Sequence, residues 1–82
     1  MNYADIFNKE LRGESINISL LIQMIEEYLT DNKKDTSVLN VIAENPQLIQ
    51  LIYPQIKEYI IKKYSICYII YNNQIITYVE NI

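Results

Sequence analysis

The sequence predicts an α+β fold, with three to four short helices followed by a C-terminal antiparallel β-hairpin. Apolar residues recur at helical spacing up to about residue 63, and the chain after that point is rich in β-branched and aromatic residues. Because 82 residues allow one small hydrophobic core, we expect a single domain over residues 1–82.

The first helix is expected over residues 2–11, inside an N-terminal helical arm of residues 1–13. Its apolar residues Tyr3 and Phe7 are one helical turn apart. Asn2 is suited to cap the start of this helix, and Gly13 is suited to end it.

A helical part is expected over residues 15–63, and its clearest helix covers residues 15–31. Ser15 or Asn17 is expected to cap this helix. Its apolar stripe consists of Ile18, Leu21, Ile22, Ile25, Tyr28 and Leu29.

Two further helical patterns follow, a short one over residues 37–44 and a longer one over residues 46–63. Pro54 lies in the middle of the longer pattern and has no N–H group to donate. The helix is therefore expected to kink or restart there, and two helices over 46–52 and 54–63 are equally acceptable.

The C-terminal part, residues 64–82, has the pattern of a β-hairpin. Asn72 and Asn73 separate two strand-like runs, and Asn suits a two-residue type I′ turn because it tolerates positive φ. Such a turn predicts that Tyr71 pairs with Gln74, Ile70 with Ile75, Ile69 with Ile76, Tyr68 with Thr77 and Cys67 with Tyr78.

With this register, both faces of the hairpin are apolar, although a hairpin packed on helices needs only one apolar face. The second face is expected to be covered by the N-terminal helix, by a second copy of the chain or by another protein; the remaining interpretation is that it is simply exposed. The predicted interface residues on that face are Cys67, Ile69, Tyr71, Ile76 and Tyr78. The predicted core consists of Ile18, Leu21, Ile22, Ile25, Leu39, Ile42, Ile49, Ile52, Ile56, Ile60, Ile66, Ile70 and Ile75.

The composition argues against an enzyme. The chain has no His, one Gly and one Cys, which removes the commonest general base, glycine-rich phosphate loops and thiolate zinc sites. Cys67 is expected to be an inert thiol. We therefore predict no catalytic residue, no metal, no cofactor and no small-molecule substrate.

The function expected from these observations is that of a small acidic module, with net charge −3, that binds another protein or itself. It would act as an adaptor or inhibitor, with a homodimer as the expected assembly. The chain has seventeen Ile, nine Asn, eight Tyr and six Lys, whose codons are A/T-rich, so an AT-rich genome such as that of a virus or another mobile element is indicated. With no signal peptide and no stretch of about 20 apolar residues, we expect a soluble cytoplasmic protein without a membrane partner.

The alternative is DNA binding. The order of three helices and a hairpin over residues 15–80 resembles that of a winged-helix domain, which implies a recognition helix within 46–63 and a wing over 65–80. Residues 32–63 carry a net charge of +2, whereas residues 1–31 carry −4. The alternative, a dimeric DNA-binding transcriptional regulator, would use Gln47, Gln50, Gln55, Lys57, Lys62 and Lys63. It ranks second because the chain has only seven basic residues, and nucleic-acid binders often neutralise about six to ten phosphates.

Overall fold

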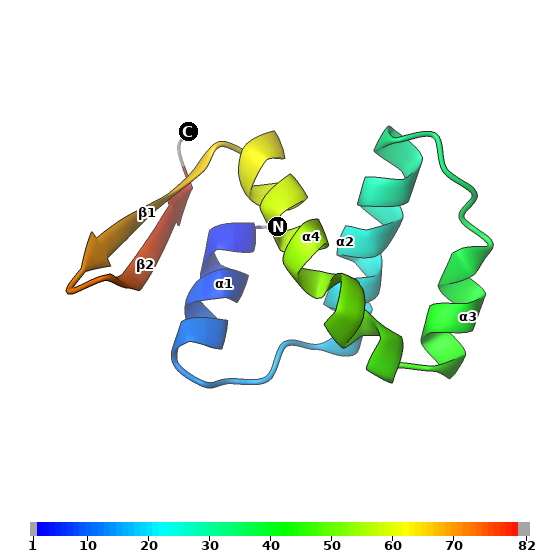
Figure 1. Cartoon of the computed structure of the whole chain (residues 1–82), viewed down its shortest axis with the longest axis horizontal. Helices are drawn as coiled ribbons and strands as arrows, with labels where there is room; N and C mark the ends of the chain where they lie inside the picture. The colour runs from blue at the N-terminus through cyan, green and yellow to red at the C-terminus, as the bar shows by residue number, and fades with distance from the viewer. Residues whose placement is uncertain (1, 81–82) are drawn as a thin grey trace. The chain divides into compact units, whose positions relative to one another are not determined.

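The computed structural model describes residues 2–80, and this part of the chain folds into four helices followed by a two-stranded antiparallel hairpin (Figure 1). The predicted α+β fold class is confirmed. The elements are α1 (Tyr3–Leu11), α2 (Ile18–Asp31), α3 (Val38–Glu44), α4 (Gln47–Lys63), β1 (Ile66–Tyr71) and β2 (Gln74–Glu80).

The chain divides into two compact units. One unit contains the N-terminal residues as far as Ile16 together with the chain from Ile60 onward, and the other unit is Asn17–Tyr59. Helix α4 begins in the second unit and ends in the first. The expectation of a single domain over residues 1–82 stays a prediction.

Helix α1 begins and ends as the sequence predicts. The Asn2 side chain accepts a hydrogen bond of 2.9 Å from the Ala4 N–H, which caps the first turn. At the other end, Gly13 has a φ of +80°, and the Glu14 N–H bonds the Lys9 carbonyl at 3.0 Å. This is a Schellman ending, which needs a residue with positive φ just after the helix.

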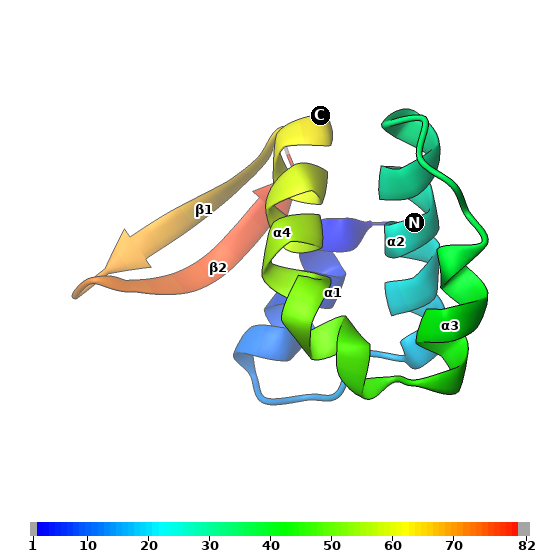
Figure 2. The ribbon, with the colours of Figure 1, turned by 45° about the vertical axis from the view of Figure 1, so that its right-hand side comes forward.

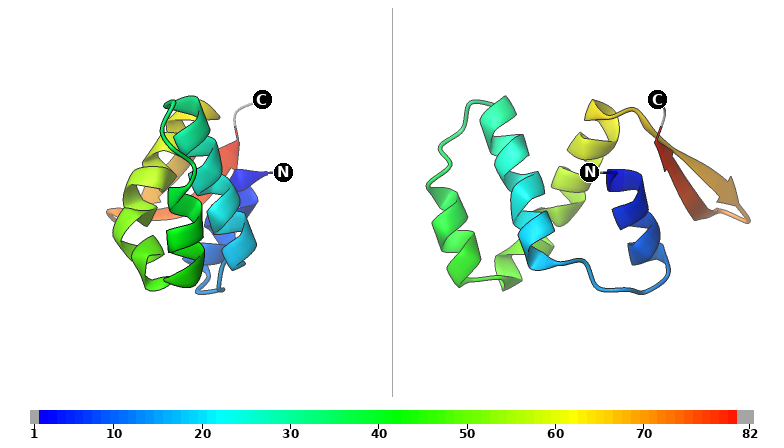
Figure 3. Two further views of the ribbon diagram at one scale, coloured as in Figure 1. Left: turned by 90° about the vertical axis from the view of Figure 1, so that its right-hand side faces the viewer. Right: turned by 180° about the vertical axis from the view of Figure 1, so that it is seen from behind.

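In the first unit, α1 packs beside β2, and β1 forms the outer strand of the hairpin; Figure 3 shows the order α1, β2, β1 in its right-hand view. Phe7 is fully buried, and its ring centroid lies 5.4 Å from that of Tyr78. A second aromatic pair joins Tyr3 and Tyr64 at 5.1 Å. The buried residues of this unit are Tyr3, Ala4, Ile6, Phe7, Ile60, Ile66 and Tyr78.

The hairpin has the predicted turn but not the full predicted register. Asn72 and Asn73 have φ values of 52° and 62°, as a type I′ turn requires, and the pairs Tyr71–Gln74 and Ile70–Ile75 form as expected. A β-bulge then leaves Ile76 without a partner in β1. The three predicted pairs beyond it are wrong by one residue, and the observed pairs are Ile69–Thr77, Tyr68–Tyr78, Cys67–Val79 and Ile66–Glu80.

The bulge changes which residues share a face. Tyr78 lies on the same face as Tyr68, not on the face of Cys67, Ile69 and Tyr71 as the sequence predicts. It is 5% exposed because it packs against Phe7 of α1. The N-terminal helix therefore covers part of the hairpin face that carries Tyr68 and Tyr78. The sequence predicts Tyr78 on the other face.

The second unit is built from α2, α3 and the first part of α4. The Asn17 side chain caps α2 by accepting a 2.7 Å hydrogen bond from the Ser19 N–H. This helix also has a Schellman ending, in which the Lys34 N–H bonds the Leu29 carbonyl at 2.8 Å while Lys33 has a φ of +55°. The buried residues of this unit are Met24, Ile25, Leu29, Ile42, Ile49 and Ile56.

Helix α4 continues through Pro54 from Gln47 to Lys63, so the alternative of two separate helices is wrong. Proline fits the helical φ, but it removes the N–H donor that would have bonded the carbonyl of Gln50, and its ring crowds that carbonyl. Gln50 is exposed, and so is Pro54. The carbonyl lies on a side of the helix that water can reach, so the missing hydrogen bond is tolerated.

The predicted core is correct in part. The assignment of Ile18 and Ile70 to the core is wrong, since these side chains are 43% and 58% exposed. Ile18 stands at the first position of α2, and Ile70 lies close to the hairpin turn. Leu21, Ile22, Leu39, Ile52 and Ile75 are half-buried, and Ile25, Ile42, Ile49, Ile56, Ile60 and Ile66 are buried as predicted.

Candidate functional site

The exposed apolar residues of the hairpin are concentrated on β1. Tyr68, Ile69, Ile70 and Tyr71 are 47%, 52%, 58% and 67% exposed. They are consecutive, so they point alternately to the two faces of the hairpin. What they share is therefore the strand and its outer edge, and not a face.

The outer edge of β2 is closed by one side chain of α1. Asn8 donates from Nδ2 to the Tyr78 carbonyl at 2.9 Å, and its Oδ1 accepts from the Tyr78 N–H at 2.7 Å. A neighbouring strand would make the same two hydrogen bonds. The Asn8 amide thus occupies the place of a third strand at this point of the sheet.

The outer edge of β1 follows from the same geometry. Because both main-chain groups of Tyr78 point to Asn8, they point away from β1, and Tyr78 and Tyr68 form a non-hydrogen-bonded pair. The main-chain groups of Tyr68 then point outward too, and so do those two residues away, at Ile66 and Ile70. Within residues 2–80 the sheet has two strands, so these groups make no ladder bonds.

The β1 edge also lacks the features that usually protect an edge strand. Charged side chains, especially Lys, and proline discourage the addition of another strand. The sequence from Ser65 to Val79 contains neither. The turn between β1 and β2 projects away from α1 (Figure 2), and Ile69, Ile70 and Tyr71 of β1 are each more than half exposed. We define the β1 edge as the strand Ile66–Tyr71 with its outward main-chain groups.

Four of the five predicted interface residues lie on the surface. Cys67, Ile69, Tyr71 and Ile76 are exposed, whereas Tyr78 is buried and is not part of an accessible surface. The Cys67 Sγ lies 3.8 Å from the Ser65 carbonyl oxygen. The sequence reasoning missed Tyr68 and Ile70, which it assigned to the covered face. Whether the predicted residues contact a partner stays a prediction.

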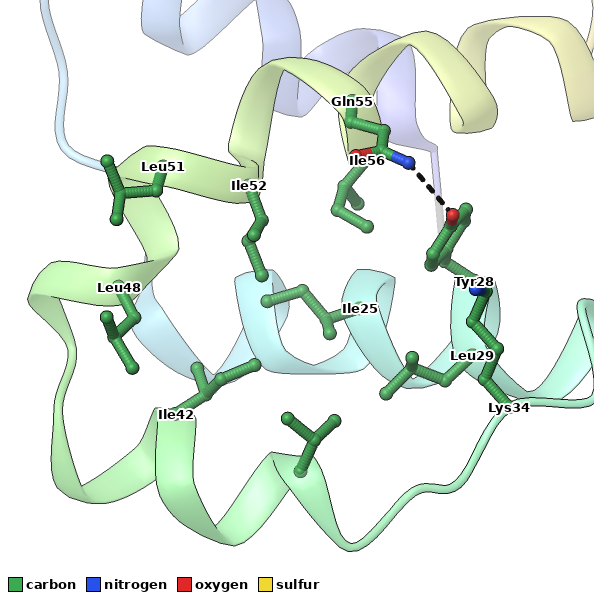
Figure 4. A pocket seen from close by; sticks show the side chains of 11 residues that line it. Ile25, Tyr28, Leu29, Lys34, Ile42, Leu48, Leu51, Ile52, Gln55 and Ile56 are labelled. Carbon is green, nitrogen blue, oxygen red and sulfur yellow. Dashed lines mark hydrogen bonds between the residues drawn. The ribbon is translucent and has the colours of Figure 1, made fainter.

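The second unit contains an apolar groove of about 390 Å³ between α2, α3 and α4. Figure 4 shows Leu48 and Leu51 at one end of it, and Tyr28, Lys34 and Gln55 at the other. The Gln55 amide donates to the Tyr28 hydroxyl at 2.9 Å. The groove is thus apolar along its length with polar groups at one end, and it is lined by Ile25, Tyr28, Leu29, Lys34, Val38, Ile42, Leu48, Leu51, Ile52, Gln55 and Ile56.

The residues predicted to contact DNA all lie on α4, and several of them have partners within the chain. Gln55 bonds Tyr28, and the Lys63 ammonium lies 5.4 Å from the centre of the Tyr64 ring. Gln47 donates weakly to Asn45, at 3.5 Å. Lys57 is half-buried, while Gln47, Gln50, Gln55, Lys62 and Lys63 are exposed.

Comparison with protein-family models, with curated proteins and with solved structures gives no match to this chain. The described residues contain no group of three or more His, Cys, Asp or Glu side chains that could hold a metal ion. Between residues 2 and 80, no helix has the length and apolar character needed to cross a bilayer.

Proposed function

We propose that this protein is a small non-enzymatic interaction module that binds a protein chain through the β1 edge. The observation that carries the proposal is the contrast between the two edges of the hairpin. The β2 edge is occupied by Asn8, and the β1 edge leaves the main-chain groups of alternate residues unbonded within the sheet. Proteins commonly bind extended segments by adding them as a strand to such an edge.

The exposed side chains support binding at this edge. Four consecutive apolar residues of β1 are about half exposed or more, and aromatic residues such as Tyr are enriched in the core of protein–protein interfaces. A chain laid along β1 would contact side chains on both faces of the strand, because they alternate. An adaptor or an inhibitor would act in this way without catalytic groups.

The test uses two variants with equal charge changes. The edge variant is Ile69→Lys with Ile70→Lys, and it places a charge on each face of β1. The control variant is Ile76→Lys with Val79→Lys on β2, at residues with similar exposure of 55% and 49%. We expect the edge variant to lose any protein that the wild type binds in a purified binding assay, while the control variant retains it.

The outcome is read only from variants whose circular dichroism matches the wild type. Equal binding by both variants contradicts the proposal, because the partner then uses another surface. Equal loss in both variants also contradicts it, because the partner would then recognise the hairpin as a whole.

DNA binding is the alternative, and it rests on the net charge of +2 over residues 32–63 and on the exposed Lys62 and Lys63 at the end of α4. Its test is a mobility shift at about 50 mM salt, where phosphate contacts are strongest. DNA binding predicts a shifted band for the wild type, which the Lys57→Glu, Lys62→Glu, Lys63→Glu variant loses. Our main proposal predicts no shift.

A further inference from the structure

We propose that the chain bound at the β1 edge is the β1 strand of a second copy. The two strands would pair antiparallel about a two-fold axis and join two hairpins into a four-stranded sheet. This inference rests on the proposed function and names its partner.

The distribution of exposed residues favours pairing along the edge over stacking of faces. Tyr68 and Ile70 lie on one face, Ile69 and Tyr71 on the other, and all four are exposed. Stacking would cover only one of these pairs. A strand placed alongside β1 flanks both faces, so it covers parts of all four side chains.

The main-chain geometry restricts the register. The outward groups of one copy must lie opposite those of the other, and they belong to Ile66, Tyr68 and Ile70. Centring the axis on Tyr68 pairs all three of these residues in each copy, whereas centring it on Ile69 pairs only Tyr68 and Ile70. With the axis on Tyr68, Tyr68 pairs with Tyr68 of the second copy, Ile66 with Ile70, and Cys67 with Ile69, so apolar residues lie opposite apolar residues in these pairs.

Charge also favours a second copy at this place. Each chain has a net charge of −3, so two copies repel one another in general. All ten acidic side chains lie outside Ser65–Val79. Two copies that pair through this segment therefore place no acidic side chain of one opposite an acidic side chain of the other. A long uncharged edge strand is otherwise a site of uncontrolled association.

The closed β2 edge limits the assembly to two copies. If both edges of the hairpin were open, pairing could continue from copy to copy. Asn8 occupies the β2 edge at Tyr78, so each chain offers one edge and the sheet stops at four strands.

The experiment combines light scattering with disulfide trapping. Wild type is expected at twice the 9.7 kDa chain mass at about 100 μM, and the edge variant at the mass of one chain. For trapping, the Ile69→Cys variant keeps Cys67. The cysteine at position 67 of each copy then lies opposite the cysteine at position 69 of the other copy. These positions form a non-hydrogen-bonded pair with Cα atoms about 4.5 Å apart, which suits a disulfide.

Two single-cysteine proteins provide the controls: the wild type, with Cys67 alone, and the Cys67→Ser, Ile69→Cys variant. Oxidation with diamide is expected to give a covalent dimer only when both cysteines are present. Equal trapping of either single-cysteine protein overturns the register and with it the pairing centred on Tyr68. A dimer that persists in the edge variant overturns pairing through β1.

If the wild type is a monomer at about 100 μM, the proposal that a second copy is the partner is contradicted. The proposed function is then judged separately, since it still predicts that a different protein binds the wild type and the control variant but not the edge variant.

Discussion

Asn8 and Tyr78 lie 70 residues apart in the sequence and are joined by two hydrogen bonds of 2.9 Å and 2.7 Å. The side-chain amide of Asn8 satisfies both outward main-chain groups of Tyr78, and the Tyr78 ring packs on Phe7 one residue earlier in α1. Helix α1 is thus attached to the hairpin by a polar and an apolar contact at the same place. This attachment leaves β1 as the open edge.

Replacing Asn8 with Ala is expected to lower the free energy of unfolding by about 2 kcal/mol, because its two partly buried hydrogen bonds with the Tyr78 main chain are lost at about 1 kcal/mol each. Urea denaturation measures this loss. Asn40→Ala on α3 is the control, since Asn40 is exposed on a helix and gains the same helix propensity. Similar unfolding free energies for the two variants would contradict the role of Asn8.

The same variant is expected to change the assembly. Without the Asn8 amide, the main-chain groups of Tyr78 become available to another strand, so both edges of the hairpin can pair. Light scattering of Asn8→Ala, under conditions where it is folded, should show species larger than a dimer. A mass equal to that of the wild type would mean that Asn8 does not limit the assembly.

The hairpin turn predicts a stabilising substitution. Asn73 has a φ of 62°, and glycine adopts this conformation at lower cost. We expect Asn73→Gly to raise the unfolding temperature by about 3 °C and Asn73→Ala to lower it by about 5 °C, since 1 kcal/mol corresponds to about 4–8 °C at this size. Thermal unfolding followed by circular dichroism is the measurement. A decrease for both variants would argue against the type I′ turn.

The ending of α2 predicts a second stabilising substitution. Lys33 has a φ of +55° at the position where most helices with this ending have glycine. Lys33→Gly is expected to raise the free energy of unfolding by about 1 kcal/mol. Lys33→Ala removes the same charge but keeps the strained conformation, so it should give no increase. Equal changes in the two variants would show that charge, and not φ, determines the effect.

Asp35 predicts a dependence of stability on pH. The Ser37 N–H donates to the Asp35 carboxylate at 2.8 Å, and this hydrogen bond, with that of the Ser37 hydroxyl, lowers the pKa of Asp35. Because the pKa is lower in the folded state, the stabilisation is complete above the unfolded-state pKa and disappears as the pH falls through the folded-state pKa. In urea denaturation from pH 6 to pH 3, Asp35→Asn should therefore lose less stability than the wild type. Parallel losses would contradict this assignment.

The elements could be predicted from local signals, because caps, glycine and apolar spacing act within a few residues. The register of the hairpin could not. Ile75 and Ile76 are adjacent and equally apolar, so the pattern does not indicate which of them β1 leaves without a partner at the bulge. The one-residue shift moved Tyr78 to the opposite face, where its ring packs on Phe7.

The closed edge could not be predicted either. Asn8 is an ordinary polar residue within a short helix, and its role depends on a main-chain segment 70 residues away. The apolar surplus of the hairpin was visible in the sequence. That it follows one strand and not one face became evident only from the observed exposures of Tyr68 to Tyr71.

Hydrogen exchange at single amides tests the central claim, that β1 is the open and binding edge, most directly. The Tyr78 N–H, bonded to Asn8, should be protected at every protein concentration. The outward N–H groups of Tyr68 and Ile70 should exchange quickly in dilute protein and become protected as the concentration rises or a partner is added. Rapid exchange of Tyr68 and Ile70 in the fully associated protein would contradict the account.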